Sequence, residues 1–165
     1  MATIEMKGID EYLIKLSRLE KASKEEICGK AIYEGAKIVA DSIKANIEAL
    51  PTDDSFGPSL PGEPPLKGPT QIQKQGLLES FGITAMQDDG TGFLNVKLGF
   101  DGYNAKKTKK WPNGQPNQMI ARSVESGTSF MQKHPFIKHT VSASRRKAVL
   151  SMKKSVSKSI DEIWR

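Results

Sequence analysis

The sequence has few of the residues on which several classes of protein depend. It holds one cysteine, Cys28, and two histidines, His134 and His139. A single cysteine excludes a disulfide framework and a multi-cysteine zinc site. No apolar run approaches the roughly 18 residues that a membrane span needs, and the charged pattern of residues 1–20 is unlike a signal peptide. We therefore expect a soluble protein that is made in a reducing compartment and has no contact with a membrane.

Aromatic residues are also scarce, at 7% of 165 residues, but 37% of the residues are hydrophobic, which suffices for one core. The length predicts a single domain over residues 1–165. Charge is unevenly distributed, because residues 1–100 have 11 basic and 15 acidic side chains, whereas residues 101–165 have 14 basic and 4 acidic. Such asymmetry is typical of a protein that binds nucleic acid or an oppositely charged neighbour, such as a second copy of itself.

Helical periodicity dominates the first 50 residues, after an alternation over residues 3–7 that predicts a short edge strand. Apolar residues from Ile9 to Leu19 form one helical stripe, and Ser23 followed by Glu26 has the pattern of a capping box that starts a second helix. This second helix is expected to run for about 25 residues and to end at Pro51. Its apolar stripe comprises Ile27, Ala31, Gly35, Ile38, Val39, Asn46, Ile47 and Leu50.

Proline interrupts the chain after the second helix. Residues 51–70 contain six of the nine prolines, so no regular element is expected there. A loop of this length is either a solvated linker or an extended arm that docks on a neighbouring subunit. We predict an arm within the Pro-rich loop of residues 51–76, mobile in the isolated subunit and ordered in an assembly, because proline restricts the backbone before docking. Its apolar side chains Phe56, Leu60 and Leu66 are candidate anchors on the neighbour.

The second half of the chain predicts a small antiparallel sheet and a long terminal helix. Residues 77–86 and 93–100 alternate as strands, and the turn of residues 87–92 joins them in a hairpin. Residues 101–117 form a polar, basic loop, and residues 119–126 fit either a helical turn or a strand. Residues 136–164 predict a helix, with a break near residues 142–146 and an apolar stripe of Ile137, Val141, Val149, Met152, Val156, Ile160 and Ile163.

These elements define an α+β fold. Long N-terminal helices and the C-terminal helix are expected to pack on the small antiparallel sheet, and the Pro-rich loop extends from it.

No arrangement of residues indicates catalysis or a cofactor. His134 and His139 are five residues apart and separated by Pro135, whereas a metal-binding pair on a helix has a spacing of four. Cys28 lies beside an apolar helix stripe, so we expect it to be a buried or half-buried small residue. The sequence has no phosphate loop, dinucleotide fingerprint or nucleophile elbow. We therefore expect a protein that is not an enzyme and needs neither cofactor nor metal.

Basic residues dominate the end of the chain. Between Ser126 and Ile160 the sequence has eight Lys and Arg residues and no Asp or Glu, whereas a solvated helix face usually mixes both signs. Such a stretch is simply a basic surface, or it contacts phosphates or docks on an acidic partner. The candidate contact residues on it are Arg145, Arg146, Lys147, Lys153 and Lys154.

Several short motifs resemble, in order and spacing, the tail-component family of long-tailed bacteriophages. The likeness begins with Ile4-x-Met6-x-Gly8-Ile9-Asp10 and continues through Leu50-Pro51, Pro61-Gly62-x-Pro64-Pro65 and Gly76-Leu77-Leu78-Glu79-Ser80-Phe81. The most telling part is Glu125-Ser126-Gly127-Thr128 followed by His134-Pro135-Phe136-Ile137, which is similar to the Glu-x-Gly-Thr and Pro-Phe-Leu signature of that family. His139-Thr140 stand where the family usually has a proline.

Three residues of this signature also carry physical expectations. Gly127 allows a positive φ or a close backbone approach. Pro135 suits the first turn of a helix, with Phe136 and Ile137 anchoring that helix on the sheet. Glu125 is the lone acid at the edge of the basic region, so it either forms an ion pair within or between subunits or is an ordinary exposed glutamate.

The resemblance implies a structural virion protein that forms or completes a ring at the head–tail junction, as neck and tail-completion proteins do. It implies a ring of identical subunits, with a hexamer preferred, and contacts with other phage neck or tail proteins. It also implies transient contact with the DNA that passes through, and a location in the virion after synthesis in the cytoplasm of the bacterial host. The alternative is a non-specific nucleic-acid-binding module that uses the basic C-terminal helix.

Overall fold

The computed structural model describes residues 9–55, 57, 62–91 and 93–165, without the side chains of residues 9, 10, 24 and 25. The expected edge strand of residues 3–7 and the candidate anchors Phe56 and Leu60 lie outside the described residues. The described helices are α1 (Ile9–Ala22), η1 (Ser23–Gly29), α2 (Lys30–Glu48), α3 (Gln71–Ser80), α4 (Asn117–Ser126) and α5 (Lys138–Trp164), and the strands are β1 (Phe81–Ile83), β2 (Gln87–Asp88), β3 (Leu94–Asn95) and β4 (Leu98–Phe100). Five α-helices and a small set of antiparallel strands confirm the α+β fold class.

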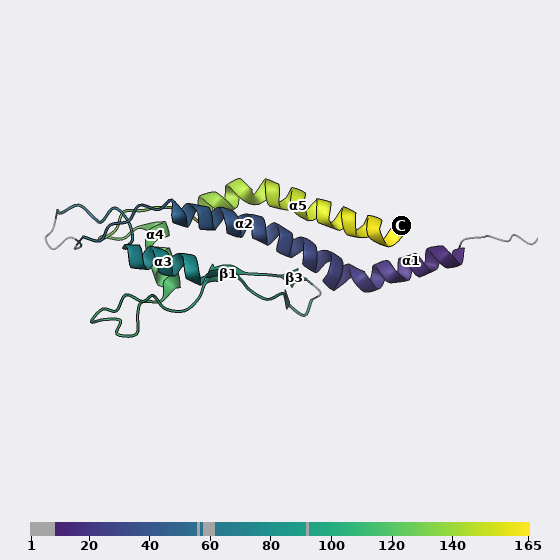
Figure 1. Cartoon of the computed structure of the whole chain (residues 1–165), viewed down its shortest axis with the longest axis horizontal. Coiled ribbons are helices and arrows are strands. Elements are labelled where there is room, and N and C mark those ends of the chain that lie inside the picture. The colour runs from purple at the N-terminus through teal and green to yellow at the C-terminus, as the bar shows by residue number, and fades with distance from the viewer. Residues whose placement is uncertain (1–8, 56, 58–61, 92) are drawn as a thin grey trace, which may run out of the picture.

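The N-terminal helices form one continuous rod that bends near η1 (Figure 1), so no new helix starts at Ser23 and the predicted capping box there is wrong. Ala22 and Lys30, which flank the π-helical η1, both have right-handed helical backbone angles. The hydroxyl of Ser23 donates to the carbonyl of Glu20 at 2.8 Å, so it does not cap a new helix. The chain stays helical because the wider π turn absorbs the change of phase between the two apolar stripes. As predicted, the rod ends before Pro51.

The terminal helix α5 runs antiparallel beside α2 for much of its length (Figure 1). The face that α5 buries is made of small residues, and the predicted stripe of large apolar residues is wrong in part, since Val141 and Val149 are 43% and 42% exposed. Small side chains let two helices approach closely, and Gly35 of α2 faces Met152 of α5 at such a contact. The helix continues through residues 142–146 without the expected break. Its buried residues are Thr140, Ser144, Ala148, Ser155 and Ser159.

The strands form a two-part antiparallel hairpin, as predicted. β1 pairs with β4 in the register Phe81↔Phe100, and β2 pairs with β3 further along the hairpin. The expected strand over residues 77–86 is wrong in its first part, because residues 77–80 belong to helix α3. The side chains of Thr70 and Gln73 form a capping box at the start of that helix, so the Pro-rich loop ends at Thr70 and not at residue 76.

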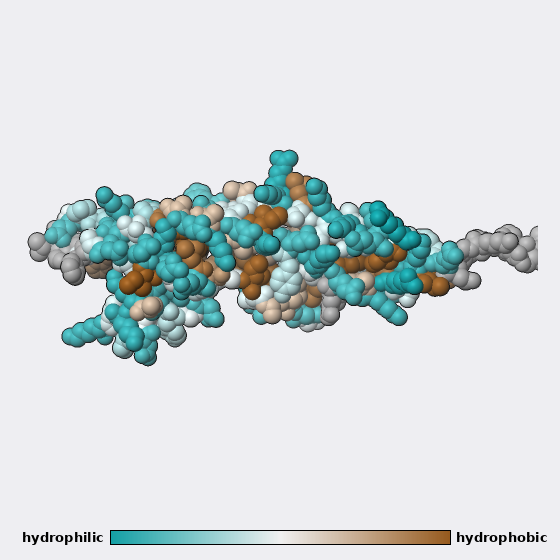
Figure 2. Space-filling model, viewed as in Figure 1, coloured by the Kyte–Doolittle hydropathy of each residue, from teal (hydrophilic) through white to brown (hydrophobic). Residues whose placement is uncertain are grey.

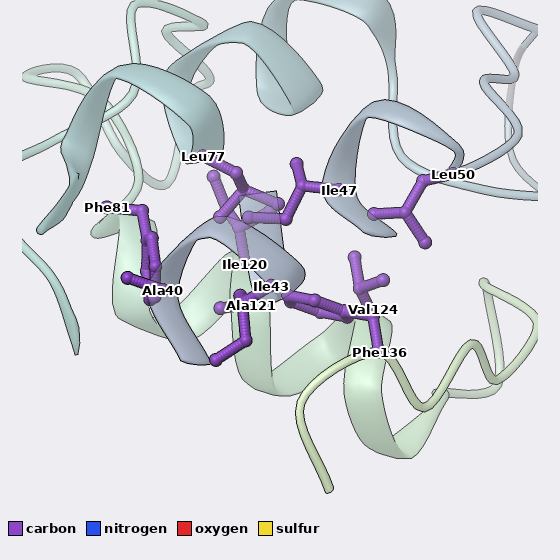
Figure 3. Close-up of a cluster of buried hydrophobic side chains, with 10 residues drawn as sticks. All are labelled: Ala40, Ile43, Ile47, Leu50, Leu77, Phe81, Ile120, Ala121, Val124 and Phe136. Carbon is purple, nitrogen blue, oxygen red and sulfur yellow. The ribbon is translucent and has the colours of Figure 1, made fainter. Parts of the chain in front are cut away.

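The hydrophobic core lies where the end of α2 meets α3, α4 and the hairpin (Figure 3). Ile43 and Ile47 of α2 are almost fully buried, together with Leu77 of α3 and Val124 of α4. Phe136, which precedes α5, packs edge-on against Phe100 of β4 with ring centroids 6.2 Å apart. The sheet therefore anchors the start of α5 through Phe136, as expected, although Pro135 precedes the helix and is not in its first turn. The rest of α5 packs mainly on α2, and its end also contacts η1 and α1.

A pair of buried asparagines fixes the basic loop, which has no helix or strand between β4 and α4. Asn104 is 2% exposed, and its amide donates to the carbonyl of Ile72 at 3.2 Å and to the side chain of Asn117 at 3.3 Å. Asn117 in turn donates to the carbonyl of Asp101 at 2.9 Å. The predicted polar loop is thus confirmed over residues 101–116, and the ambiguous segment after it is helix α4.

Candidate assembly surfaces

Glu125 has a different partner from the one expected, because its carboxylate caps helix α5. Oε2 accepts from the backbone N–H of Ile137 at 2.7 Å, and Oε1 accepts from that of Lys138 at 3.0 Å. The first N–H groups of a helix have no partner within the helix, and the helix dipole favours a negative charge there. Glu125 therefore ties the end of α4 to the start of α5. The two elements are 12 residues apart in sequence, so no local spacing pattern reveals this cap.

Gly127 shapes the turn between α4 and the cap. Its φ is 74°, as expected for a glycine at the end of a helix. A Cβ built on Gly127 would lie 3.0–3.2 Å from atoms of Lys133, so the backbone also approaches closely here. The backbone N–H of His134 then donates to the carbonyl of Val124 at 2.8 Å. Together these contacts hold residues 125–137 as a compact connection between the two helices.

The described end of the Pro-rich loop packs on its own chain. The N–H of Leu66 donates to the carbonyl of Phe130 at 2.9 Å, and the N–H of Gln132 donates to the carbonyl of Leu66 at 2.8 Å. The carboxylate of Asp53 accepts from the backbone N–H of Lys67 at 3.0 Å, and the ring of His134 bonds to the carbonyl of Lys67. The expectation of a free arm is therefore wrong for Leu66, which joins a loop-to-loop bridge within the subunit.

Exposed cations cover the outside of α5. Arg145, Arg146, Lys147, Lys153 and Lys154 are all exposed, and none faces the core. Lys147, Lys153 and Lys154 line a groove of about 810 Å³ along α5, to which Ile38 of α2 contributes, whereas Arg145 and Arg146 lie outside it. The structure thus divides the predicted basic residues into two groups on one helix.

The far end of the hairpin is acidic. It contains Asp88 and Asp89 and an exposed aromatic ring, since Phe93 is 73% exposed. The pKa of Asp89 is lowered by a hydrogen bond from the Thr91 hydroxyl and by another from its backbone N–H, so this carboxylate is ionised at neutral pH. The sequence pattern predicts a turn over residues 87–92, whereas Gln87 and Asp88 form β2, and neither acid was among the candidate contact residues. An aromatic residue close to two acids, Phe93, is the signal in the sequence that points to this surface.

The helix α1 exposes large apolar side chains. Tyr12, Leu13 and Ile14 are each more than half exposed. One contact that positions α1 is made by the end of α5, where the rings of Tyr12 and Trp164 lie 5.3 Å apart and Lys15 donates to the carbonyl of Trp164 at 3.0 Å. Tyr12 and Leu13 share one face of α1 with Leu16, which is 38% exposed, and a protein that is folded and alone in water rarely keeps such a face open.

The remaining candidates for a reactive or metal-binding site are Cys28 and groups of metal-ligating side chains. Cys28 is exposed, so the expectation of a buried residue is wrong, because η1 turns this position away from α5. Within residues 9–55, 57, 62–91 and 93–165, no three His, Cys, Asp or Glu side chains are placed to hold a metal ion. The described helices include none that is long and apolar enough to cross a membrane.

The chain matches no protein-family model, no curated protein and no solved structure.

Proposed function

We propose that this chain is a structural virion protein of a tailed bacteriophage that forms or completes a ring at the head–tail junction. The motifs that resemble the tail-component family support this function. The structural observation that carries it is the apolar surface of α1, where Tyr12, Leu13 and Ile14 are each more than half exposed. Burial of this surface against another subunit would stabilise an assembly, because each fully buried Leu or Ile contributes about 1.5–3 kcal/mol.

The elongated shape of the subunit supports the same function. The rod of α1, η1 and α2 spans roughly 60 Å, and α5 lies along it (Figure 1). Side chains exposed at both ends of such a rod are available to different neighbours at once. Identical subunits that meet through two different surfaces form a closed ring when the rotation between them closes, and a hexamer is the assembly that the resemblance favours.

The proposed ring is tested by measuring the mass of the purified protein with light scattering after size-exclusion chromatography. We expect a discrete particle several times the 18.1 kDa subunit mass. The Leu13→Glu variant should shift the protein toward the monomer, because it places a charge in the apolar contact. Arg18→Glu on the same helix is the matched control, since it changes the charge further but removes no exposed apolar side chain. Equal masses for Leu13→Glu and wild type would exclude α1 from the ring contact.

A second candidate function is non-specific binding of nucleic acid through α5. The observation that favours it is the exposure of all five candidate cations, Arg145, Arg146, Lys147, Lys153 and Lys154. Phosphate contacts release counterions, so the logarithm of the affinity for duplex DNA would fall with log salt with a slope of about −0.9 for each phosphate contacted. A mobility-shift assay across salt tests this function. Tight binding at physiological salt that Arg145→Glu/Arg146→Glu weakens would favour it over the ring.

A further inference from the structure

The groove on α5 combines a positive rim with an apolar floor. Lys147 and Lys154 lie two helical turns apart along it, and Leu150, about one turn from each of them, is 53% exposed. Ile38 of α2 contributes a second apolar side chain to the lining. Figure 2 shows such apolar patches between hydrophilic side chains along the paired helices. At the C-terminal end of the groove both signs of charge are present, because Asp161 and Glu162 join Lys158 and Arg165 in the lining, and Lys158 pairs with Glu162 at 3.9 Å.

This combination calls for an occupant with an apolar side chain next to negative charges. The tip of the hairpin has this composition, because Asp88 and Asp89 lie close in sequence to the exposed ring of Phe93 and residues 87–94 include no Lys or Arg. The volume of the groove, about 810 Å³, is several times that of a phenylalanine side chain. An aromatic ring on Leu150 would bury apolar surface on both sides, and the carboxylates would face the lysines of the rim.

The hairpin tip does not reach the groove of its own subunit. α5 packs on one side of α2, whereas β1 and β3 pack on the opposite side of the rod formed by η1 and α2 (Figure 1). The acidic tip and the basic groove therefore face different neighbours. Contacts of this kind are head to tail, so each copy gives its tip to one neighbour and its groove to the next.

We propose that the groove of one copy, at Lys147, Leu150 and Lys154, receives the hairpin tip of a second copy, at Asp88, Asp89 and Phe93. The contact rests on the proposed function, because it names the surfaces through which copies in the ring would meet. It also assigns separate roles to the cations of α5. Lys147 and Lys154 face the neighbouring copy, and Arg145 and Arg146 stay outside the contact.

Two pairs of matched variants test the contact in the full-length protein. Lys147→Glu/Lys154→Glu reverses the rim, and Arg145→Glu/Arg146→Glu makes the same change of charge on the same helix outside the groove. At the tip, Asp88→Asn/Asp89→Asn removes two charges but keeps side-chain oxygens that accept the hydrogen bonds of the turn. Asp41→Asn/Glu48→Gln is its control, because it removes two charges from exposed positions on α2 that lie outside the groove. Each mass is measured by light scattering over a range of concentration and salt.

We expect the groove variant and the tip variant each to raise the concentration at half-assembly by about tenfold or more, and both controls to stay within about twofold of wild type. Salt should weaken the wild-type assembly and have less effect on the tip variant. Circular dichroism should show the same helix content for all five proteins, so that a loss of assembly is not a loss of fold.

Three results would overturn the contact, and they distinguish it from the ring itself. A discrete wild-type particle that both variants still form would refute the contact and leave the ring intact. Equal losses for the groove variant and its arginine control would indicate a diffuse basic surface, as expected for nucleic acid. A wild-type monomer at every concentration would refute both. If the wild type forms open chains and no closed particle, and the groove and tip variants no longer form these chains, the contact holds and the ring is refuted.

Discussion

Replacement of Glu125 by alanine should destabilise the fold by about 2 kcal/mol, because it removes the cap of the longest described α-helix. The carboxylate accepts two backbone N–H groups of α5, at 2.7 Å from Ile137 and 3.0 Å from Lys138. Loss of a cap costs about 0.5–2 kcal/mol, and a hydrogen bond to a charged group contributes about 1.5–3 kcal/mol, which partial exposure to water reduces. Alanine is a better helix former than glutamate, so the change carries no penalty of its own in α4.

The glutamine variant separates charge from hydrogen bonding at this position. Glu125→Gln keeps one oxygen that accepts an N–H group but loses the negative charge beside the helix dipole, so we expect a loss of about 1 kcal/mol. In thermal unfolding the alanine variant should melt about 4–8 °C below wild type, and the glutamine variant about 2–4 °C below. Glu48→Ala at an exposed position of α2 is the control. If the Glu125→Ala variant has the same melting temperature as the Glu48→Ala control, the account of the cap is refuted.

Three further predictions concern the packing and the loops. Gly35→Leu should cost about 1–3 kcal/mol in urea unfolding, because a Cβ there would lie 2.6 Å from Cγ of Met152. Addition of Met152→Ala to Gly35→Leu should restore part of this loss, because it removes the side chain in the way. Asn104→Ala should cost about 1–3 kcal/mol, because it leaves Oδ1 of the buried Asn117 and the carbonyl of Ile72 without their donor, whereas no change would show that water replaces the amide. Hydrogen bonds from the Ser55 hydroxyl and from the Lys67 N–H lower the pKa of Asp53. The ionised carboxylate therefore stabilises the fold above about pH 4, and this stabilisation is lost as the pH falls through the lowered pKa of Asp53. The difference in melting temperature between wild type and Asp53→Asn should therefore shrink from pH 6 to pH 3, and a constant difference would contradict this reasoning.

Local patterns predicted the elements that depend on neighbouring residues. Pro51 ends the long rod because a proline disrupts a helix interior, and the alternation of residues 93–100 marks one arm of the hairpin. Helix α3 was also predictable from the sequence, because Thr70 and Gln73 have the spacing of a capping box, but the prolines before it favoured the prediction of a loop. The core residues Ala40 and Ile43 were absent from the predicted stripe of the second helix, although the structure buries both.

The features that the sequence pattern predicted wrongly, or did not predict, depend on contacts between distant segments. α5 buries serine, threonine and alanine because a small side chain permits close approach to α2, and a search for large apolar residues selects the neighbouring face. The hydroxyl of Ser144 is satisfied by the carbonyl of Thr140 at 2.6 Å, so its burial leaves no unpaired donor. The cap by Glu125 and the bridge from Leu66 to Gln132 join segments that only the fold brings together. The acidic tip is likewise a candidate contact only because the fold places it on the opposite side of the rod from the basic groove.

The central claim is that copies of this chain assemble through defined surfaces on the helical rod. The most direct measurement is the solution mass of the wild-type protein by light scattering, from low to high concentration and from low to high salt. The account predicts a discrete particle of several 18.1 kDa subunits at low salt, seen as a ring by electron microscopy, that dissociates as salt rises. A monomer at every concentration and every salt would contradict it.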